Sequence, residues 1–200
     1  MCAVTGSDTT PRNEPDAAPG TDPMTLAAAL QAELFGRSLM LATAESLTGG
    51  RVGDVLSAAP GASDTYLGGV ISYATEVKQK VLGVPGGVVH EHGVVSAECA
   101  AAMASGVRDL LGADYGVSTT GVAGPTTQEG KPIGLVFVGV AGPRGVRTQR
   151  FDFDGERPEI REQTMRAAID VALEVVRADV RQDGEPDAEP DEGRDAGGAG

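Results

Sequence analysis

The chain has 200 residues, of which 40% are apolar and only 4% are aromatic, so it can bury one domain core built mainly from aliphatic side chains. Its 29 acidic and 16 basic residues give a formal net charge of −13, which argues against a nucleic-acid groove or an anionic membrane surface as the main partner. No apolar run approaches the roughly 18 residues that a membrane helix needs, and the two cysteines show no disulfide or zinc spacing, so we expect a cytoplasmic protein.

The acidic residues are concentrated at the two ends of the chain. Residues 1–23 contain four acids and one arginine, and residues 178–200 contain eight acids and two arginines, so the ends account for nine of the thirteen net negative charges. Such compositions bury too little apolar surface to offset the entropy lost on ordering. We therefore predict disordered tails over residues 1–22 and 180–200 around a single domain of residues 23–179.

Between the tails, helical and extended patterns alternate. The periodicity predicts helices at 24–36, 48–59, 76–82, 96–112 and 157–178, strands at 38–43, 69–73, 114–119, 133–140 and 146–153, and a loop at 83–93. Gly and Pro between the last two strands predict a hairpin. Buried strands that alternate with helices fit an α/β fold with a mixed, mainly parallel sheet covered on both faces. Ligands bind such sheets beyond the carboxyl ends of the strands.

The first motif, residues 43–50 (TAESLTGG), follows the first predicted strand. A hydroxyl-rich turn with paired glycines at the start of a helix presents backbone N–H groups and the positive end of the helix dipole to an anion. Ser46 is a candidate nucleophile if a base lies nearby. The same residues are equally consistent with a helix N-cap and a tight turn, and the glycine spacing matches neither a P-loop nor a dinucleotide fingerprint.

The second motif, residues 72–78 (SYATEVK), lies where a buried strand turns into a helix. Lys78 is one of only three lysines, against thirteen arginines. A lysine, unlike an arginine, loses its proton readily when it is buried, and a neutral amine can deprotonate a serine. Lys78 is therefore a candidate general base. The alternative is a solvated charge on a helix, which is what we expect for Lys80.

The third motif, residues 119–125 (TTGVAGP), again follows a predicted strand. Its small residues and free backbone N–H groups suit the close approach of a phosphate or a carbonyl oxygen. The alternative is an ordinary turn rich in Gly and Pro.

Five further residues are weaker candidates. Arg157 and Arg161 lie one helical turn apart, where they could clamp a phosphate or pair with acidic neighbours on the helix surface. His90 and His92 lack an evident third ligand, so no metal site is expected. Cys99 lies on the apolar side of a predicted helix, where a core position is expected.

Taken together, these stretches resemble the CinA C-terminal domain family, the nicotinamide-nucleotide amidases (NMN deamidases). The resemblance spans nearly all of residues 24–177 and includes further short motifs between and after the three described above. In chain order the matching residues are Ala44–Gly50, Tyr73, Lys78, Leu82–Val84, His92–Ser96, Thr120–Pro125, Lys131–Gly134, Gly155–Arg157 and Arg161.

The resemblance implies a three-layer α/β/α sandwich that hydrolyses the carboxamide of nicotinamide mononucleotide to nicotinate mononucleotide and ammonia, in pyridine-nucleotide salvage. It implies no metal and no organic cofactor. Homodimers or higher homo-oligomers are expected, and neither nucleic acid nor a membrane is expected as a partner.

The resemblance also implies roles for individual residues. Ser46 matches the nucleophile, Lys78 its general base, and Tyr73 an aromatic hydroxyl near that pair. Arg157, favoured over Arg161, matches the arginine on the phosphate side of the substrate. The expected substrate-binding residues are Glu45, Thr48, Gly49, Gly50, Thr120, Gly121, Gly124, Arg157 and Arg161.

Two residues depart from the family's pattern. Leu47 stands where many members have Cys, and Thr75 stands where many have Asn. A catalytically silent nucleotide-binding or interaction module is the alternative function, and it would need the glycines but not the Ser46 and Lys78 pair. A DNA-transaction role is the weakest alternative because the chain has no basic stripe.

Overall fold

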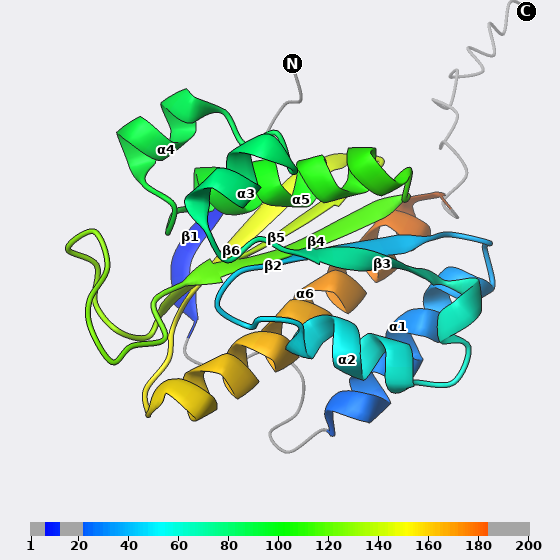
Figure 1. Cartoon of the computed structure of the whole chain (residues 1–200). Helices are drawn as coiled ribbons and strands as arrows, with labels where there is room; N and C mark the ends of the chain where they lie inside the picture. Colours follow the sequence, from blue (N-terminus) through cyan, green and yellow to red (C-terminus); the bar gives the residue numbers. More distant parts are fainter. Residues whose placement is uncertain (1–6, 13–21, 184–200) are drawn as a thin grey trace, which may run out of the picture.

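The computed structural model describes residues 7–12 and 22–183. These residues form a six-stranded mixed sheet between two layers of helices (Figure 1), in the strand order β1-β6-β5-β4-β2-β3. The strands are β1 (Ser7–Arg12), β2 (Leu41–Glu45), β3 (Tyr66–Ile71), β4 (Tyr115–Gly121), β5 (Leu135–Gly142) and β6 (Gly145–Asp152). Three strand pairs are parallel, and the β4/β5 and β5/β6 pairs are antiparallel. The predicted α/β fold and its three-layer sandwich are confirmed.

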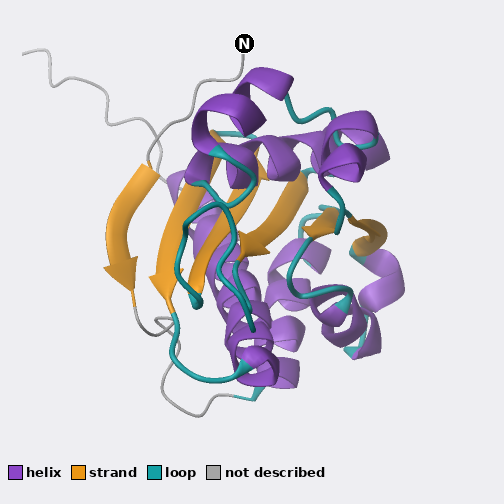
Figure 2. Ribbon diagram, turned by 60° about the vertical axis from the view of Figure 1, so that its left-hand side comes forward, coloured by secondary structure: helices purple, strands orange, loops and turns teal. Residues whose placement is uncertain are grey.

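The helices divide between the two faces of the sheet. They are α1 (Pro23–Phe35), α2 (Arg51–Ala58), a short 3-10 turn (Ala62–Asp64), α3 (Thr75–Lys80), α4 (Gly86–His92), α5 (Ala97–Leu111) and α6 (Arg157–Asp183). Helices α3, α4 and α5 lie on one face, and α1, α2 and α6 lie on the other (Figure 1, Figure 2). Each side buries an aliphatic core, with Leu30 and Ile169 on the α1/α6 side and Met103 and Val107 on the α5 side. Within the described residues, no helix has both the length and the apolar character of a membrane span.

The register of the parallel strands determines where a site can form. Glu45, the last residue of β2, pairs with Ile71 of β3 on one side and with Thr119 of β4 on the other. Strands β2, β3 and β4 therefore end at the same edge of the sheet. All three sequence motifs begin at this edge, which is where ligands bind in sheets of this kind.

Helix α5 packs unusually close to the sheet. A Cβ atom added to Gly116 of β4 would lie 2.1 Å from the carbonyl oxygen of Ala104, and one added to Gly139 of β5 would lie 2.6 Å from that of Ala100. Only glycine permits these approaches. The helix begins as predicted at Ser96, whose hydroxyl accepts a hydrogen bond from the Cys99 N–H at 3.1 Å.

The prediction of a loop over residues 83–93 is wrong, because residues 86–92 form α4. The sequence signal is weak because the helix has only seven residues, two of which are glycines in its first turn. Pro85 has the extended backbone of an N-cap, and Gly93 ends the helix with a φ of 79°. The bounds of the helix are therefore set by its two ends rather than by an apolar stripe.

The predicted tails differ from the structure in two described segments. Residues 7–12 form β1, which pairs in parallel with β6, and α6 continues to Asp183, beyond the predicted domain end at 179. The composition of the tail does not predict β1, because this strand is held by backbone hydrogen bonds to the edge of β6 and such bonds do not require apolar side chains. The rest of the predicted tails, residues 1–6, 13–21 and 184–200, lies outside the described residues.

Candidate active site

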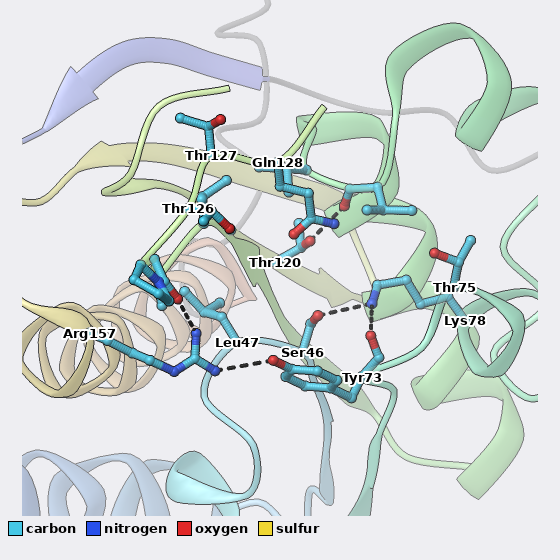
Figure 3. Close-up of a pocket in the computed structure, with 17 residues that line it drawn as sticks. Ser46, Leu47, Tyr73, Thr75, Lys78, Thr120, Thr126, Thr127, Gln128 and Arg157 are labelled. Carbon is cyan, nitrogen blue, oxygen red and sulfur yellow. Dashed lines mark hydrogen bonds between the residues drawn. The ribbon is translucent and has the colours of Figure 1, made fainter. Parts of the chain in front are cut away.

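A cavity of about 500 Å³ lies at the shared carboxyl edge of β2, β3 and β4 (Figure 3). Its walls come from the residues that follow these strands, from the segment before α5, and from the N-terminus of α6. The lining residues are Ser46, Leu47, Tyr73, Thr75, Lys78, Val94, Val95, Thr120, Gly121, Val122, Ala123, Gly124, Pro125, Thr126, Thr127, Gln128 and Arg157.

Ser46 and Lys78 meet at the floor of this cavity. Ser46 directly follows β2, and its backbone N–H donates to the Thr119 carbonyl at 3.1 Å, which extends the β2/β4 ladder by one residue. The Lys78 Nζ donates to the Ser46 Oγ at 2.9 Å, to the Ser72 carbonyl at 2.6 Å and to the Tyr73 carbonyl at 3.4 Å. The three protons of an ammonium thus have three acceptors. In the neutral form, two N–H donors can stay on the carbonyls while the lone pair faces the serine hydroxyl.

Burial makes the neutral form of Lys78 accessible. The residue is only 1% exposed, and removal from water lowers the pKa of the Lys78 amine below its ordinary value of 10.5. The negative charge of Cys99, when its thiol is ionised, and that of the nearby Glu129 carboxylate act in the opposite direction. Burial also raises the pKa of the Cys99 thiol to about 11, so near pH 7 this thiol is uncharged. Cys99 is completely buried within the core cluster on the α5 side, as expected for a core residue rather than a nucleophile.

Tyr73 and Arg157 close another side of the cavity. The Arg157 guanidinium, at the first residue of α6, donates to the Tyr73 hydroxyl at 3.1 Å and to the Gly124 carbonyl at 2.5 Å. Figure 3 shows Arg157 and Lys78 on opposite sides of Ser46. Arg157 therefore offers a cationic group to one end of a ligand while Ser46 and Lys78 face another part of it.

Arg161 has a different position from Arg157 and does not line the cavity. Its guanidinium donates to the carbonyls of Leu47 at 2.8 Å and Thr48 at 2.7 Å. It also lies against Gly49, where an added Cβ would be 2.9 Å from a guanidinium nitrogen. Arg161 thus holds the backbone of the turn that follows the nucleophile. Of the two arginines expected on the phosphate side, the structure brings only Arg157 to the cavity.

Glu45 is adjacent to the nucleophile but points to the other face of the sheet. Its carboxylate accepts hydrogen bonds from the N–H groups of Gly50 at 2.9 Å, Val52 at 3.1 Å and Gly53 at 2.8 Å, at the start of α2. Consecutive strand residues project to opposite faces, so Glu45 caps α2 while Ser46 faces the cavity. Glu45 and Gly50 were expected to bind substrate, and the structure places both outside the cavity lining.

Two more residues of the first motif also lie outside the lining. Thr48 is fully buried, and its hydroxyl shares a 2.8 Å hydrogen bond with the Thr119 hydroxyl. Gly49 and Gly50 have positive φ angles of 59° and 99°, which turn the chain into α2. The motif therefore supplies Ser46 and Leu47 to the cavity, and its remaining residues shape the turn that presents them.

The third motif contributes several residues to the cavity lining. Thr120, Gly121 and Gly124 all contribute to its wall, and the Thr120 hydroxyl donates to the Val94 carbonyl at 2.6 Å. The two positions that depart from the family's pattern, Leu47 and Thr75, are also on the wall.

Five lining residues were given no role at the site from the sequence. Thr126, Thr127 and Gln128 follow the third motif directly, and their polar character was the available signal. Val94 and Val95 come from the segment between α4 and α5. Nothing in the local sequence shows that this segment folds over the ends of β2 and β4.

The His-x-His pair lies away from the cavity lining. His92, the last residue of α4, has its ring nitrogens 3.8 Å from the carboxylates of Glu91 and Glu98. In the described part of the chain, no group of three His, Cys, Asp or Glu residues is arranged to hold a metal ion. In the cavity itself, Ser46 offers a hydroxyl, Lys78 an amine and Arg157 a guanidinium.

Comparisons with known proteins agree with the fold and extend over most of the domain. The family model described as the CinA C-terminal domain matches residues 24–176. A CinA-like protein of Frankia casuarinae is 51% identical over 138 residues, and a putative competence-damage inducible protein of Desulforamulus reducens is 47% identical over 139 residues. These matches cover 69% and 70% of this chain but only 32% and 34% of the relatives. The chain thus spans about one third of the length of the curated relatives it matches.

Solved structures share the fold over almost their whole length. A CinA superfamily protein from Klebsiella pneumoniae matches with a TM-score of 0.76 and 31% identity, over 79% of this chain and 99% of that chain. A competence/damage inducible protein from Agrobacterium tumefaciens matches with a TM-score of 0.73 and 32% identity, over 77% of this chain and 96% of that chain.

The capping role of Glu45 makes a prediction about stability. In Glu45→Gln, an amide replaces a buried carboxylate that accepts three backbone N–H bonds, so we expect the free energy of unfolding to fall by about 1–3 kcal/mol. Denaturant unfolding followed by circular dichroism measures this change. The exposed Glu76→Gln is the control and should match the wild-type protein. An equal loss in both variants, or none in Glu45→Gln, contradicts the capping role.

Proposed function

The chain belongs to the CinA C-terminal domain family, and from that premise we propose that it is a nicotinamide-nucleotide amidase that converts nicotinamide mononucleotide to nicotinate mononucleotide and ammonia. The observation that supports this most directly is the 2.9 Å contact between the buried Lys78 Nζ and the Ser46 Oγ. A serine beside a desolvated amine is an activated nucleophile suited to acyl transfer. The proposal is therefore a serine amidohydrolase with Lys78 as its base.

In the acylation half of the proposed reaction, the neutral Lys78 amine takes the proton of the Ser46 hydroxyl as Oγ bonds to the carboxamide carbon. The carbonyl electron pair moves onto oxygen, where backbone N–H groups of the cavity wall, from Leu47 and from the third motif, stabilise the charge. When the carbonyl re-forms, the C–N bond breaks and the Lys78 ammonium gives its proton to the departing nitrogen. Ammonia leaves, and nicotinate mononucleotide remains as an ester on Ser46.

In the deacylation half, water takes the place of the serine hydroxyl as nucleophile. Neutral Lys78 removes a proton from water as its oxygen bonds to the ester carbon. The C–Oγ bond then breaks, and Ser46 recovers its proton from the Lys78 ammonium. Nicotinate mononucleotide leaves after its new carboxyl group gives the second proton of the water to solvent, and both residues return to their starting state.

The size and charge of the cavity support a mononucleotide substrate. Its volume of about 500 Å³ falls within the roughly 300–1,000 Å³ typical of small-ligand sites. Arg157 uses part of its guanidinium on Tyr73 and Gly124, which leaves further N–H donors for the 5′-phosphate. Thr120 and Gln128 offer polar groups to the ribose and the carboxamide.

The proposal also includes four expectations that come from the sequence and from its resemblance to the family. These are a homodimer or higher homo-oligomer, a place in pyridine-nucleotide salvage, activity without a metal or organic cofactor, and a cytoplasmic location. A silent nucleotide-binding module would use the same cavity without turnover, so binding and ammonia release have to be measured separately.

Removal of either member of the Ser46 and Lys78 pair should abolish turnover. In Ser46→Ala and Lys78→Met, we expect ammonia release from nicotinamide mononucleotide to fall by roughly 10³-fold or more, because one variant lacks the nucleophile and the other lacks its base. Lys80→Met removes an exposed lysine from the same helix and should keep wild-type activity. A coupled ammonia assay on the purified full chain measures all four proteins.

Two outcomes of that assay contradict the proposal at different levels. No turnover by the wild-type protein, with the nucleotide still bound in calorimetry, favours the silent module. Full activity in Lys78→Met leaves the amidase reaction in place and removes Lys78 as its base.

The pH dependence should report the protonation of Lys78. Only the neutral amine can accept the serine proton, so kcat/KM should rise with pH and level off as Lys78 loses its proton. Burial lowers the pKa of Lys78, so the plateau should begin below the ordinary lysine value of 10.5. Initial rates between about pH 6 and 10 test this in a constant-ionic-strength buffer series. A rate that is flat or falls with rising pH over the whole range contradicts Lys78 as the base.

Arg157 should discriminate between substrates with and without a phosphate. In Arg157→Gln, we expect KM for nicotinamide mononucleotide to rise about 10- to 100-fold, because a charge-assisted contact with phosphate is lost. Nicotinamide riboside, which lacks the phosphate, should show little change in kcat/KM between the wild-type protein and the variant. An equal fall in kcat/KM for both substrates would show that Arg157 maintains the shape of the cavity and does not recognise the phosphate.

A further inference from the structure

Val94 and Val95 form an apolar wall of the cavity although they belong to no helix or strand. The wall lies between α4 and α5, and its backbone is fixed by side chains. The Val94 carbonyl accepts from the Thr120 hydroxyl at 2.6 Å, and the Ser96 hydroxyl donates to the Gly93 carbonyl at 3.0 Å. A wall without its own secondary structure depends on such contacts to keep its shape.

Glu129 supplies one of the contacts that hold this wall. Its two carboxylate oxygens lie 3.2 and 3.0 Å from the Val94 N–H, which donates to them. Glu129 itself has a φ of 53°, a left-handed conformation that is unfavourable for a residue with a Cβ. The backbone conformation at position 129 would favour a glycine. A glutamate is present there although it is strained, and its carboxylate supplies the acceptor that the Val94 N–H needs.

Lys131 supplies the complementary contacts. Its Nζ donates to the carbonyls of His92 and Val95, each at 2.7 Å, on either side of the peptide that Glu129 holds. The same Nζ lies 3.5 Å from the Glu129 carboxylate. The side chains of Glu129 and Lys131 are 35% and 25% exposed, so this ion pair is partly shielded from water.

The turn that presents these two side chains also lines the cavity. Two backbone hydrogen bonds close the turn that contains Glu129: the Lys131 N–H donates to the Gln128 carbonyl at 2.8 Å, and the Gln128 N–H donates to the Lys131 carbonyl at 3.4 Å. Gln128 is on the cavity wall. At Gly93, an added Cβ would lie 2.3 Å from the Glu129 carboxylate and 2.9 Å from the Lys131 Nζ, so the absence of a side chain there lets the turn approach.

We propose that Glu129 and Lys131 form a clamp that fixes the Gln128 turn to the apolar wall and thereby positions both against the bound substrate. The clamp residues do not touch the reacting atoms, so they are positioning residues for the amidase proposed above, on which this inference rests.

Electrostatics gives Glu129 a second effect on the same site. Its negative charge favours the ammonium form of Lys78 and so raises the pKa of that amine against the larger effect of burial. The other titratable group facing Lys78 is Cys99 of α5, which acts on the amine only when its thiol is ionised and whose pKa of about 11 keeps it neutral near pH 7. Lys131, beside Glu129, and Glu98 of α5 complete the charges around this thiol.

Hydrogen exchange tests the clamp without any need for turnover. The full chain is compared as wild type, Glu129→Ala and Glu76→Gln, the control in which an exposed ion pair with Lys80 is broken. In Glu129→Ala, we expect faster exchange in peptides that cover residues 93–96 and 126–131, and no change elsewhere in the sheet. Exchange in these peptides that stays at the wild-type rate overturns the clamp.

Kinetics tests whether the clamp positions substrate. We expect KM for nicotinamide mononucleotide to rise about tenfold in Glu129→Ala and in Lys131→Met, with a smaller change in kcat. Glu129→Gln keeps an acceptor for Val94 but lacks the charge, so the pKa of Lys78 falls and the rising limb of kcat/KM moves to lower pH. A KM equal to wild type in Glu129→Ala overturns the positioning role, whereas a limb that does not move in Glu129→Gln contradicts only the electrostatic effect of Glu129 on Lys78.

The two proposals fail in different ways. A wild-type protein that releases no ammonia contradicts the amidase, and the exchange comparison still decides whether the clamp exists. An active wild-type protein whose Glu129→Ala variant has unchanged exchange and unchanged KM contradicts the clamp alone. Glu76→Gln should keep wild-type kinetics throughout.

Discussion

The burial of one lysine is the constraint from which the site follows. Lys78 is almost completely removed from water, and an ammonium in that position is costly unless each of its protons has an acceptor. Two of the three acceptors are the backbone carbonyls of Ser72 and Tyr73, which come within reach because the chain leaves β3 and turns at once into α3. The third is the Ser46 hydroxyl. The turn that lets the lysine be buried therefore also aims it at the nucleophile.

The serine follows a strand of the sheet, and neighbouring residues at this strand end have different roles because their side chains project to opposite faces. Ser46 projects into the cavity on the α3 side, while Glu45 projects to the other side and caps the start of α2. Arg161 holds the carbonyls of the intervening turn. The position of the nucleophile is thus fixed through the backbone on both sides of the sheet. This explains why so many polar residues of the first motif do not reach the cavity.

The sequence predicts the parts of the site that depend on strand ends, and misses the parts that depend on long-range packing. Ser46, Lys78 and the third motif could be located because parallel strands end at one edge of a sheet. Glu45 and Arg161 were expected at the substrate from the resemblance, and their place in the sequence does not show which way each side chain points. Gln128 and the wall of Val94 and Val95 were missed because the contacts that place them join residues about 35 positions apart. Strand β1 and helix α4 were missed for a related reason, since neither has an apolar pattern of its own.

The two residues that depart from the family's pattern affect the cavity surface but not the contacts of Lys78. Leu47 and Thr75 both line the cavity, so their side chains change the surface that a substrate meets. Neither provides an acceptor to Lys78, whose partners are two backbone carbonyls and Ser46. A substitution cannot remove a backbone carbonyl, so the contacts that hold the Lys78 amine beside Ser46 persist when the surrounding side chains change. The pairing of amine and serine is therefore separable from the choice of substrate: the first is built into the β3–α3 turn, and the second lies in the side chains around it.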